Sequence, residues 1–290
     1  MKQSIGIFLA LICCSIVLSI AFASSATGGS LRYQTIERAS DSIGQYTIHA
    51  VIIPRNSGYL VSPSIAGDLQ TIADFADDRV VAAINGGYFD PVNQKTTSFV
   101  VENRQIIADP RFNERLVDNP DLKPYLRKIF NRAEFRRYDC GGITQYDIQL
   151  HFAPVPNNCT LIESLGAGPG LLPEDTSVAE GFVAYQNGEK IRDAIGNDSS
   201  NARSAVGITQ AGDVILVMVA QQPDLPLDSG ISLNRLAQEM SDLGAVRAMN
   251  LDGGSSASLY YDGEAIYGKV DRAGNKIIRP IESALVVTKP

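Results

Sequence analysis

The sequence VVAAINGGYFD at residues 80–90 contains the pattern on which the fold prediction depends. A short apolar run, typical of a buried strand, ends at Asn85 and is followed directly by Gly86 and Gly87. The sequence AVRAMNLDGGSS at residues 245–256 has the same arrangement, with an acid and two glycines after the strand. Glycine tolerates the backbone conformations in which the N–H groups of such a turn approach a ligand. The two turns therefore predict a ligand site at strand ends, and their similarity indicates either a distant duplication or a recurring helix–strand unit.

Further strands and two helices are predicted around these turns. Patterns typical of strands occur at residues 46–53, 146–152, 202–209, 214–220 and 284–288, with a hairpin over 259–266. One helix is predicted to begin at Ser64, with Ile65, Leu69, Ile72 and Phe75 on one face. A second helix is predicted between a capping Ser232 and Gly244. The predicted fold class is α+β, with mixed β-sheets and packed helices in a single domain over residues 45–290 and an insertion around residues 102–160.

The first 44 residues are predicted to stand apart from this domain. Lys2 precedes an apolar run that ends at Ala23, and AFA at residues 21–23 has the small-x-small pattern of a signal peptidase site. Residues 1–23 are therefore expected to be a signal peptide that directs the chain to the periplasm or the medium. An uncleaved anchor is the alternative, and any membrane contact is expected through this segment alone. Residues 24–44 are expected to be a linker.

The cysteine pattern follows from the predicted export. The chain has four cysteines, and removal of the signal peptide would leave Cys140 and Cys159. In an oxidising compartment, two cysteines at this separation predict one disulfide, with two buried free thiols as the alternative.

Charge and composition narrow the class of function. The chain has 290 residues, with 25 Lys and Arg against 32 Asp and Glu, a net charge of -7. This acidic balance argues against a nucleic-acid partner, which would require a basic surface. The two histidines, His49 and His151, argue against a zinc site or a His-based triad, and both are expected to be structural. The chemistry is therefore expected to depend on carboxylates, amides, hydroxyls and arginine.

Three segments taken together resemble the phosphodiester glycosidase domain family. They are NGGYFD at 85–90, ARSAVGI at 202–208 and NLDGGSS at 250–256, in the order in which the family has them. The segment GAGP at 166–169 is similar to a Gly-rich segment of the family. The resemblance covers residues from about Gln45 to the C-terminus. The family includes the enzyme that uncovers mannose 6-phosphate by removing N-acetylglucosamine, and bacterial members labelled as exopolysaccharide-biosynthesis proteins.

The resemblance implies hydrolysis of a sugar-1-phosphodiester, with three residues in catalytic roles. Asp252 is the candidate nucleophile or general base, and its alternative role is to cap a turn. Arg203 is the candidate ligand of the phosphate, since a guanidinium holds two phosphate oxygens in one plane, and its alternative role is an ordinary ion pair. The Asn85 amide would donate to a sugar hydroxyl, orient a water or hold its turn.

A larger group of residues is predicted to contact the substrate. These residues are Gly86, Gly87, Asp90, Gly168, Asn250, Gly253, Gly254, Ser255 and Ser256. Glycosidic cleavage usually requires two carboxylates. Candidates for the second are Asp90, for which a turn role is equally plausible, and Glu163 and Glu282.

The sequence leaves two further kinds of site as alternatives, a metal site and an additional anion site. No cofactor is certain, but Asp252, Asp90 and backbone carbonyls could hold Ca²⁺ or Mg²⁺. An arginine-rich span could form an anion-binding rim or an ordinary solvated face. Its members are Arg104, Arg111, Arg115, Arg127, Arg132, Arg136 and Arg137.

The sequence thus predicts an exported glycoside hydrolase that acts on sugar-1-phosphodiesters or related envelope and exopolysaccharide linkages. One alternative is a non-catalytic polysaccharide-binding or exopolysaccharide assembly factor. A further alternative is a phosphodiesterase that cleaves the P–O bond.

Overall fold

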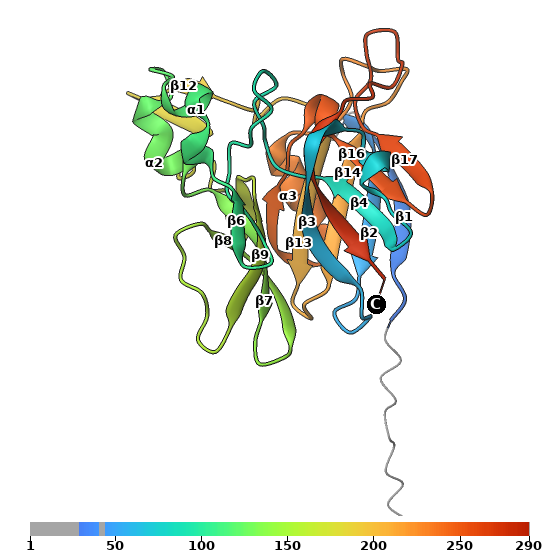
Figure 1. The fold of residues 1–290 in the computed structure, drawn as a ribbon. Helices are drawn as coiled ribbons and strands as arrows, with labels where there is room; N and C mark the ends of the chain where they lie inside the picture. The colour runs from blue at the N-terminus through green and yellow to red at the C-terminus, as the bar shows by residue number, and fades with distance from the viewer. Residues whose placement is uncertain (1–28, 41–43, 290) are drawn as a thin grey trace, which may run out of the picture.

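A computed structural model describes residues 29–40 and 44–289. The predicted signal peptide at residues 1–23 lies outside these described residues. Within them, no helix is long and apolar enough to cross a membrane. Antiparallel strands are the main regular structure of the described chain, and they assemble into three large sheets and one small hairpin (Figure 1).

The largest sheet has six strands in the order β1-β2-β14-β13-β15-β10. Their bounds are β1 Arg32–Ser40, β2 Gly44–Ile53, β14 Val214–Ala220, β13 Arg203–Thr209, β15 Ala245–Asn250 and β10 Gly170–Leu172. The central strand β14 is buried along its whole length, as its continuous apolar sequence predicts. The predicted strands at 46–53, 202–209 and 214–220 are confirmed within a residue or two of their ends.

A second sheet has five strands in the order β17-β16-β4-β18-β3. Their bounds are β17 Glu264–Tyr267, β16 Ser258–Tyr261, β4 Val80–Asn85, β18 Ile281–Thr288 and β3 Leu60–Gln70. The predicted hairpin at residues 259–266 is confirmed as β16 and β17, which turn at Asp262 and Gly263. This sheet carries the first motif at the end of β4.

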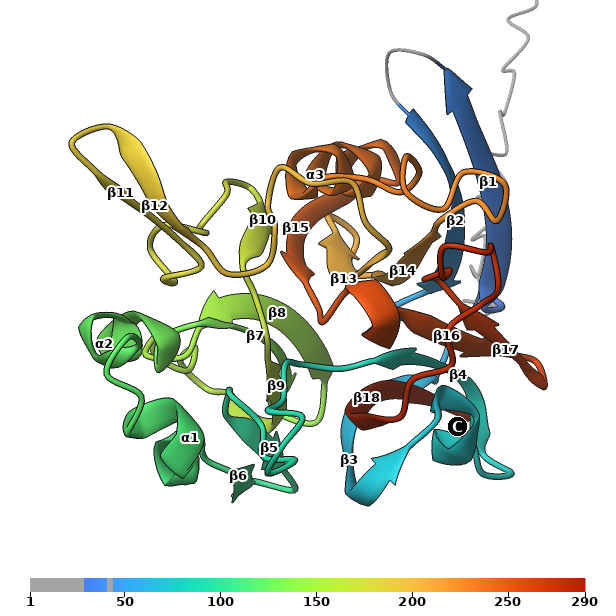
Figure 2. The same ribbon diagram turned by 90° about the horizontal axis from the view of Figure 1, so that it is seen from above.

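A third sheet, in the order β6-β5-β9-β7-β8, contains most of the predicted insertion at residues 102–160. Its strands are β6 Gln105–Ala108, β5 Val100–Glu102, β9 Thr160–Gly166, β7 Ala133–Asp139 and β8 Thr144–Leu150. Two short helices, α1 (Glu114–Val117) and α2 (Leu126–Ile129), lie on the same side of the molecule as this sheet when it is seen from above (Figure 2). The hairpin of β11 (Val183–Gln186) and β12 (Glu189–Asp193) lies on that side as well.

One continuous apolar core contains residues from all three large sheets. The opposite face of the six-stranded sheet is covered by α3 (Leu233–Asp242), which buries Leu233, Leu236 and Met240 against it. This helix begins after the predicted cap, since the Ser232 side chain accepts from the Arg235 N–H. In the described part of the chain, α1 and α2 are single turns and α3 is the one longer helix. The prediction of several packed helices is therefore wrong, and the fold is mostly β.

The helix predicted from Ser64 is also wrong. Residues Leu60–Gln70 form β3, which pairs with β18, and only Ile72–Phe75 form a short 3-10 turn. The apolar spacing that indicated a helix is divided between the strand and the turn. Pro63 fits within β3 because this strand lies at the edge of its sheet, where a missing N–H costs little.

The predicted linker at residues 24–44 contains a strand. Arg32–Ser40 forms β1, which pairs with β2 over nine residues, so the folded region begins before residue 45. An ion pair fixes β1 to the sheet, because Arg38 Nη2 lies 3.1 Å from Glu239 Oε2 on α3. Tyr46 also donates to the buried Glu239, at 2.8 Å. The strand that the sequence assigned to a linker thus supplies one of the partners of this buried carboxylate, together with Tyr46 and Arg235.

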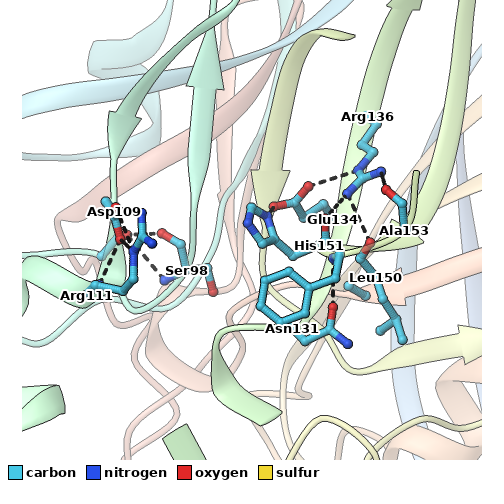
Figure 3. A network of polar contacts seen from close by, with 12 residues as sticks. Ser98, Asp109, Arg111, Asn131, Glu134, Arg136, Leu150, His151 and Ala153 are labelled. Carbon is cyan, nitrogen blue, oxygen red and sulfur yellow. Dashed lines mark hydrogen bonds and ion pairs between the residues drawn. The ribbon is translucent and has the colours of Figure 1, made fainter. Parts of the chain in front are cut away.

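The third sheet is fastened by a disulfide and by a polar network. Cys140 and Cys159 form the predicted disulfide, which joins the end of β7 to the start of β9. In the network, Glu134 on β7 accepts from Arg136 Nε at 2.9 Å and lies 2.5 Å from His151 Nδ1 (Figure 3). The structure thus places His151 in a structural contact at the end of β8.

The buried side chain of Asn85 connects the first motif to the other two. Its Nδ2 donates to the Asp252 carbonyl at 2.6 Å, while its Oδ1 accepts from the Ser204 hydroxyl at 2.6 Å and from the Ser258 N–H at 3.1 Å. Ser204 lies on β13 in the six-stranded sheet, and Ser258 begins β16 in the second sheet. One amide therefore holds the ends of strands from two sheets at a fixed separation.

Replacing Asn85 should destabilise the fold as well as any activity. We expect Asn85→Ala to lower the free energy of unfolding by about 2–5 kcal/mol, because it leaves several buried polar partners unsatisfied. Chemical denaturation measures this change, with Asn157→Ala at an exposed loop position as the control. A change below about 0.5 kcal/mol for Asn85→Ala would contradict the role assigned to this amide.

Candidate active site

Asp252 lies in the loop after β15, where its backbone is held from both sides. Its N–H donates to the Gly86 carbonyl at 3.0 Å, and its carbonyl accepts from Asn85. The residue as a whole is partly exposed, and its carboxylate accepts from the Gly253 N–H at 2.9 Å. Burial raises the pKa of Asp252 to about 6, against the opposing effects of the Ser256 hydroxyl, the Arg279 charge and the Gly253 N–H. A carboxyl group with this pKa exchanges its proton close to neutral pH, as a general acid or base requires.

Arg279, which the sequence analysis missed, lies beside Asp252. Its Nη1 donates to the Ser255 hydroxyl at 2.9 Å, and its guanidinium lies 5.1 Å from the centre of the Phe89 ring. Arg279 thus connects the loop before β18 to Phe89 of the first motif and to Ser255 of the third motif. No motif marks Arg279, because it stands in a loop whose proximity to Asp252 is created by the pairing of β18 with β4.

Arg203 is buried at the start of β13 and donates to backbone carbonyls. Its Nη2 donates to the carbonyls of Gly196 at 2.6 Å and Ser199 at 2.9 Å, and its Nε and Nη1 donate to those of Ile231 and Ile195. These four bonds use most of the five N–H groups of the guanidinium. The Arg203 side chain therefore links the loop at residues 195–199 to the backbone of Ile231. A bidentate contact with a phosphate would require Arg203 to release some of these carbonyls.

The glycines of the two turns allow close packing of the backbone. Gly86 N donates to the Ser283 carbonyl at 2.7 Å, and Gly87 N donates to the Ser283 hydroxyl at 3.2 Å. A Cβ at Gly86 would lie 2.4 Å from the Ser283 hydroxyl, and one at Gly87 would lie 2.3 Å from the Gly166 carbonyl. In the third motif, Gly254 N donates to the Ala202 carbonyl. These N–H groups donate to protein acceptors in this structure, so their hydrogen bonds lend no support to the prediction that they face a ligand.

A second cluster surrounds the hydroxyl of Tyr88, which the sequence analysis did not select. This hydroxyl donates to the Gly168 carbonyl at 2.9 Å and accepts from Asn250 Nδ2 at 2.6 Å. The structure therefore brings together two residues that the sequence predicted to bind substrate, Gly168 and Asn250. The Asn250 Oδ1 is buried without a hydrogen-bond partner. The pKa of Tyr88 is raised by burial and by the charge of Asp252, which places the cluster beside that carboxylate.

The other predicted carboxylates lie in different environments. Asp90 accepts from the Val92 N–H at 2.7 Å and pairs with Arg115 at 2.8 Å, contacts that lower its pKa and give it a turn role. Glu163 pairs with Arg137 at 2.8 Å. Glu282 precedes Ser283 on β18, and burial raises its pKa to about 8. Of these three, Glu282 is the one whose pKa is raised, and it lines a hollow with Thr96, Asp109 and Phe112 that does not include Asp252.

The structure shows no prepared metal centre in the part of the chain that it describes. No group of three His, Cys, Asp or Glu side chains in residues 29–40 and 44–289 is arranged to hold a metal ion. Asp90 is occupied by Arg115, so the pairing of Asp90 with Asp252 around Ca²⁺ or Mg²⁺ gains no support from this arrangement.

Most of the arginine-rich span is engaged with acids. Arg111 pairs with Asp109, Arg115 with Asp90, Arg136 with Glu134 and Arg137 with Glu163. Arg104 and Arg127 are exposed, whereas Arg132 is buried. The span therefore does not form a continuous anion-binding rim.

Comparison with known proteins agrees with the geometry. The family model for phosphodiester glycosidase matches residues 78–288, which include Asn85, Arg203 and Asp252. The catalytic domain of zebrafish N-acetylglucosamine-1-phosphodiester alpha-N-acetylglucosaminidase, auto-inhibited by its pro-peptide, is similar with a TM-score of 0.65 and 16% identity. That similarity covers 91% of this chain and 85% of the zebrafish chain.

A hypothetical protein from Synechocystis is similar with a TM-score of 0.59 and 18% identity over 89% of this chain. The match spans 62% of the Synechocystis chain. No curated protein matches the sequence significantly. At these identities the solved structures show a shared fold, whereas the family model covers most of the chain. The chain belongs to the phosphodiester glycosidase family.

Proposed function

We propose that this chain is an exported glycoside hydrolase that cleaves the glycosidic bond of a sugar-1-phosphodiester, or a related linkage in an envelope or exopolysaccharide polymer. The observation that carries the proposal is the Asp252 carboxylate. It lies where the first and third family motifs meet, it belongs to a partly exposed residue, and its pKa is raised to about 6. Family membership supports the class of bond, and the zebrafish protein of similar fold is named for the same class.

In the proposed reaction, Asp252 acts as general base or nucleophile at the anomeric carbon. The transition state resembles an oxocarbenium ion, which a carboxylate stabilises by its charge. The leaving group is a phosphate monoester anion of low basicity, so the need for a strong general acid is small. Arg279 lies beside Asp252 and favours its ionised form, while the backbone bonds to Gly86 and Asn85 hold the carboxylate in place.

Export is supported by the N-terminal sequence and by the disulfide. Disulfides form and persist in oxidising compartments, and Cys140 and Cys159 are joined in the folded domain. We expect the exported chain to begin at Ser24, and N-terminal sequencing of the protein recovered outside the cytoplasm measures this. A chain that retains Met1 in a membrane fraction would support the uncleaved anchor instead.

Hydrolysis in ¹⁸O-labelled water tests the reaction. The purified protein is given a panel of sugar-1-phosphodiesters, and we expect label in the sugar and none in the phosphate. Asp252→Asn should lower kcat by about 10²–10⁴-fold, because the amide cannot accept a proton or attack. Asp262→Asn at the exposed hairpin turn is the matched control and should retain full activity.

Other outcomes of this experiment identify the alternatives. Label in the phosphate would show cleavage of the P–O bond. Binding of the polymer without turnover of any phosphodiester would support a non-catalytic assembly factor. Full activity of Asp252→Asn would show that another group performs the catalysis.

The raised pKa of Asp252 also predicts a dependence of stability on pH. In the unfolded chain its pKa returns to about 4, so the folded state favours the protonated form and loses stability as the pH rises from about 4 to 6. Asp252→Asn removes this pH-dependent loss of folding stability, because the asparagine amide does not titrate. We expect the variant to equal the unsubstituted protein below pH 4 and to exceed it above pH 6, by at most about 3 kcal/mol. Denaturation midpoints across this range measure the difference, and a variant that is less stable at pH 7 would contradict the assigned pKa.

A further inference from the structure

Arg132 is a buried cation in the loop immediately before β7. Its side chain is 7% exposed, and its guanidinium lies 3.9 Å from the centre of the Phe182 ring and 5.9 Å from that of Tyr88. The two rings are themselves 5.5 Å apart, so they form an aromatic wall beside the guanidinium. This wall orients the charge by cation–π attraction, which does not neutralise it.

Arg132 makes no hydrogen bond or ion pair through its side chain with any residue that the structure describes. Its Nε is shielded from solvent without a partner, whereas the two Nη atoms, also unpartnered, keep contact with solvent. The other buried arginines differ in this respect. Arg136 pairs with Glu134, and Arg203 donates to four carbonyls.

The carboxylate whose charge acts on Arg132 is committed to other donors. Glu180 accepts from the N–H groups of Ala133 and Gly170, both at 2.8 Å, and from the Thr176 hydroxyl. It therefore supports the loop around Arg132 without forming an ion pair with it. Burial lowers the pKa of Arg132 to about 10, so the guanidinium remains charged at neutral pH. A buried charge without a partner is unfavourable, and an anionic ligand would relieve that cost.

Arg132 and Asp252 act on the same hydroxyl. The charge of Asp252 raises the pKa of Tyr88, and the charges of Arg132 and Arg203 oppose it. The Tyr88 hydroxyl also contacts Gly168 and Asn250, which directly precedes the Asp252 loop. Tyr88 therefore lies between the two groups: its ring faces the unpartnered Arg132 guanidinium, and its hydroxyl contacts Asn250 at the start of the Asp252 loop.

We propose that Arg132 binds the phosphodiester anion of the substrate, with its free Nη hydrogens donating to the phosphate oxygens. This inference rests on the proposed function, and it assigns the phosphate to Arg132 while Arg203 keeps the loop at residues 195–199 in place. A planar guanidinium presents two parallel donors to a phosphate, which a lysine cannot do. No bond is made or broken at this position, so its contribution is to binding and orientation.

Inorganic phosphate is the probe for this site. Its affinity is measured by isothermal titration calorimetry for the full chain and for Arg132→Gln, Arg132→Lys and Arg127→Gln, the last being an exposed control. We expect Arg132→Gln to weaken phosphate binding at least about tenfold, Arg132→Lys to restore part of it, and Arg127→Gln to have no effect. In phosphate-free buffer the melting temperature of Arg132→Gln should equal or exceed that of the unsubstituted protein, since an unpartnered buried charge is removed.

Two results would overturn the inference. One is phosphate binding that is absent from the unsubstituted protein or unchanged in Arg132→Gln. The other is a lower melting temperature of Arg132→Gln in phosphate-free buffer that Arg132→Lys restores without restoring phosphate binding, which would show a packing role.

Kinetics separates this inference from the proposed reaction. If the protein hydrolyses sugar-1-phosphodiesters with an unchanged KM in Arg132→Gln, the phosphate assignment fails and the proposed function stands. If phosphate binding depends on Arg132 but no phosphodiester is hydrolysed, the assignment stands and the proposed function fails.

Discussion

The hydrogen bonds of the Asn85 side chain are the interaction on which the arrangement of the motifs depends. Both ends of the amide are used, so the residue accepts from β13 and β16 while it donates to the backbone of Asp252. The surrounding glycines follow from this constraint. Gly86 and Gly87 allow the first motif to approach Ser283 and Gly166 more closely than any side chain would permit. The position of the Asp252 carboxylate is therefore set by backbone contacts, and it requires no adjustment of flexible side chains.

Much of the fold could be predicted from local sequence. The apolar run of β14, the turn residues Asp262 and Gly263, and the caps of α3 each specify their structure within a few residues. The errors arose where long-range pairing decided the outcome. The spacing of Ile65, Leu69 and Ile72 fits a helix, but pairing with β18 gives those residues extended structure. Likewise β1 has little apolar character, and its place depends on the backbone of β2 and on Glu239.

The motifs in the sequence were enough to locate the candidate site, but they did not predict which residues contact one another within it. The order of the motifs identified Asp252 and the family, because an acid beside two glycines is a local pattern. The partners of each arginine are not local. Arg203 and Arg132 have the same side chain, yet one is surrounded by carbonyls and the other by aromatic rings. The role of the glycine turns could not be predicted for a related reason, since glycine serves both unusual backbone conformations and close approach, and only the neighbours distinguish these uses.

The division of the described residues into sheets has a consequence for how sequence changes affect the candidate site. Asp252 and Arg279 belong to the two sheets that share Asn85, whereas Arg132 belongs to the third sheet, which is built mainly from residues 102–160. The proposed reacting group and the proposed substrate anchor thus come from different sheets, which meet in one apolar core and at Tyr88. Under the proposed function, substitutions in the third sheet that leave this shared packing unchanged can alter the surroundings of Arg132 without moving Asp252.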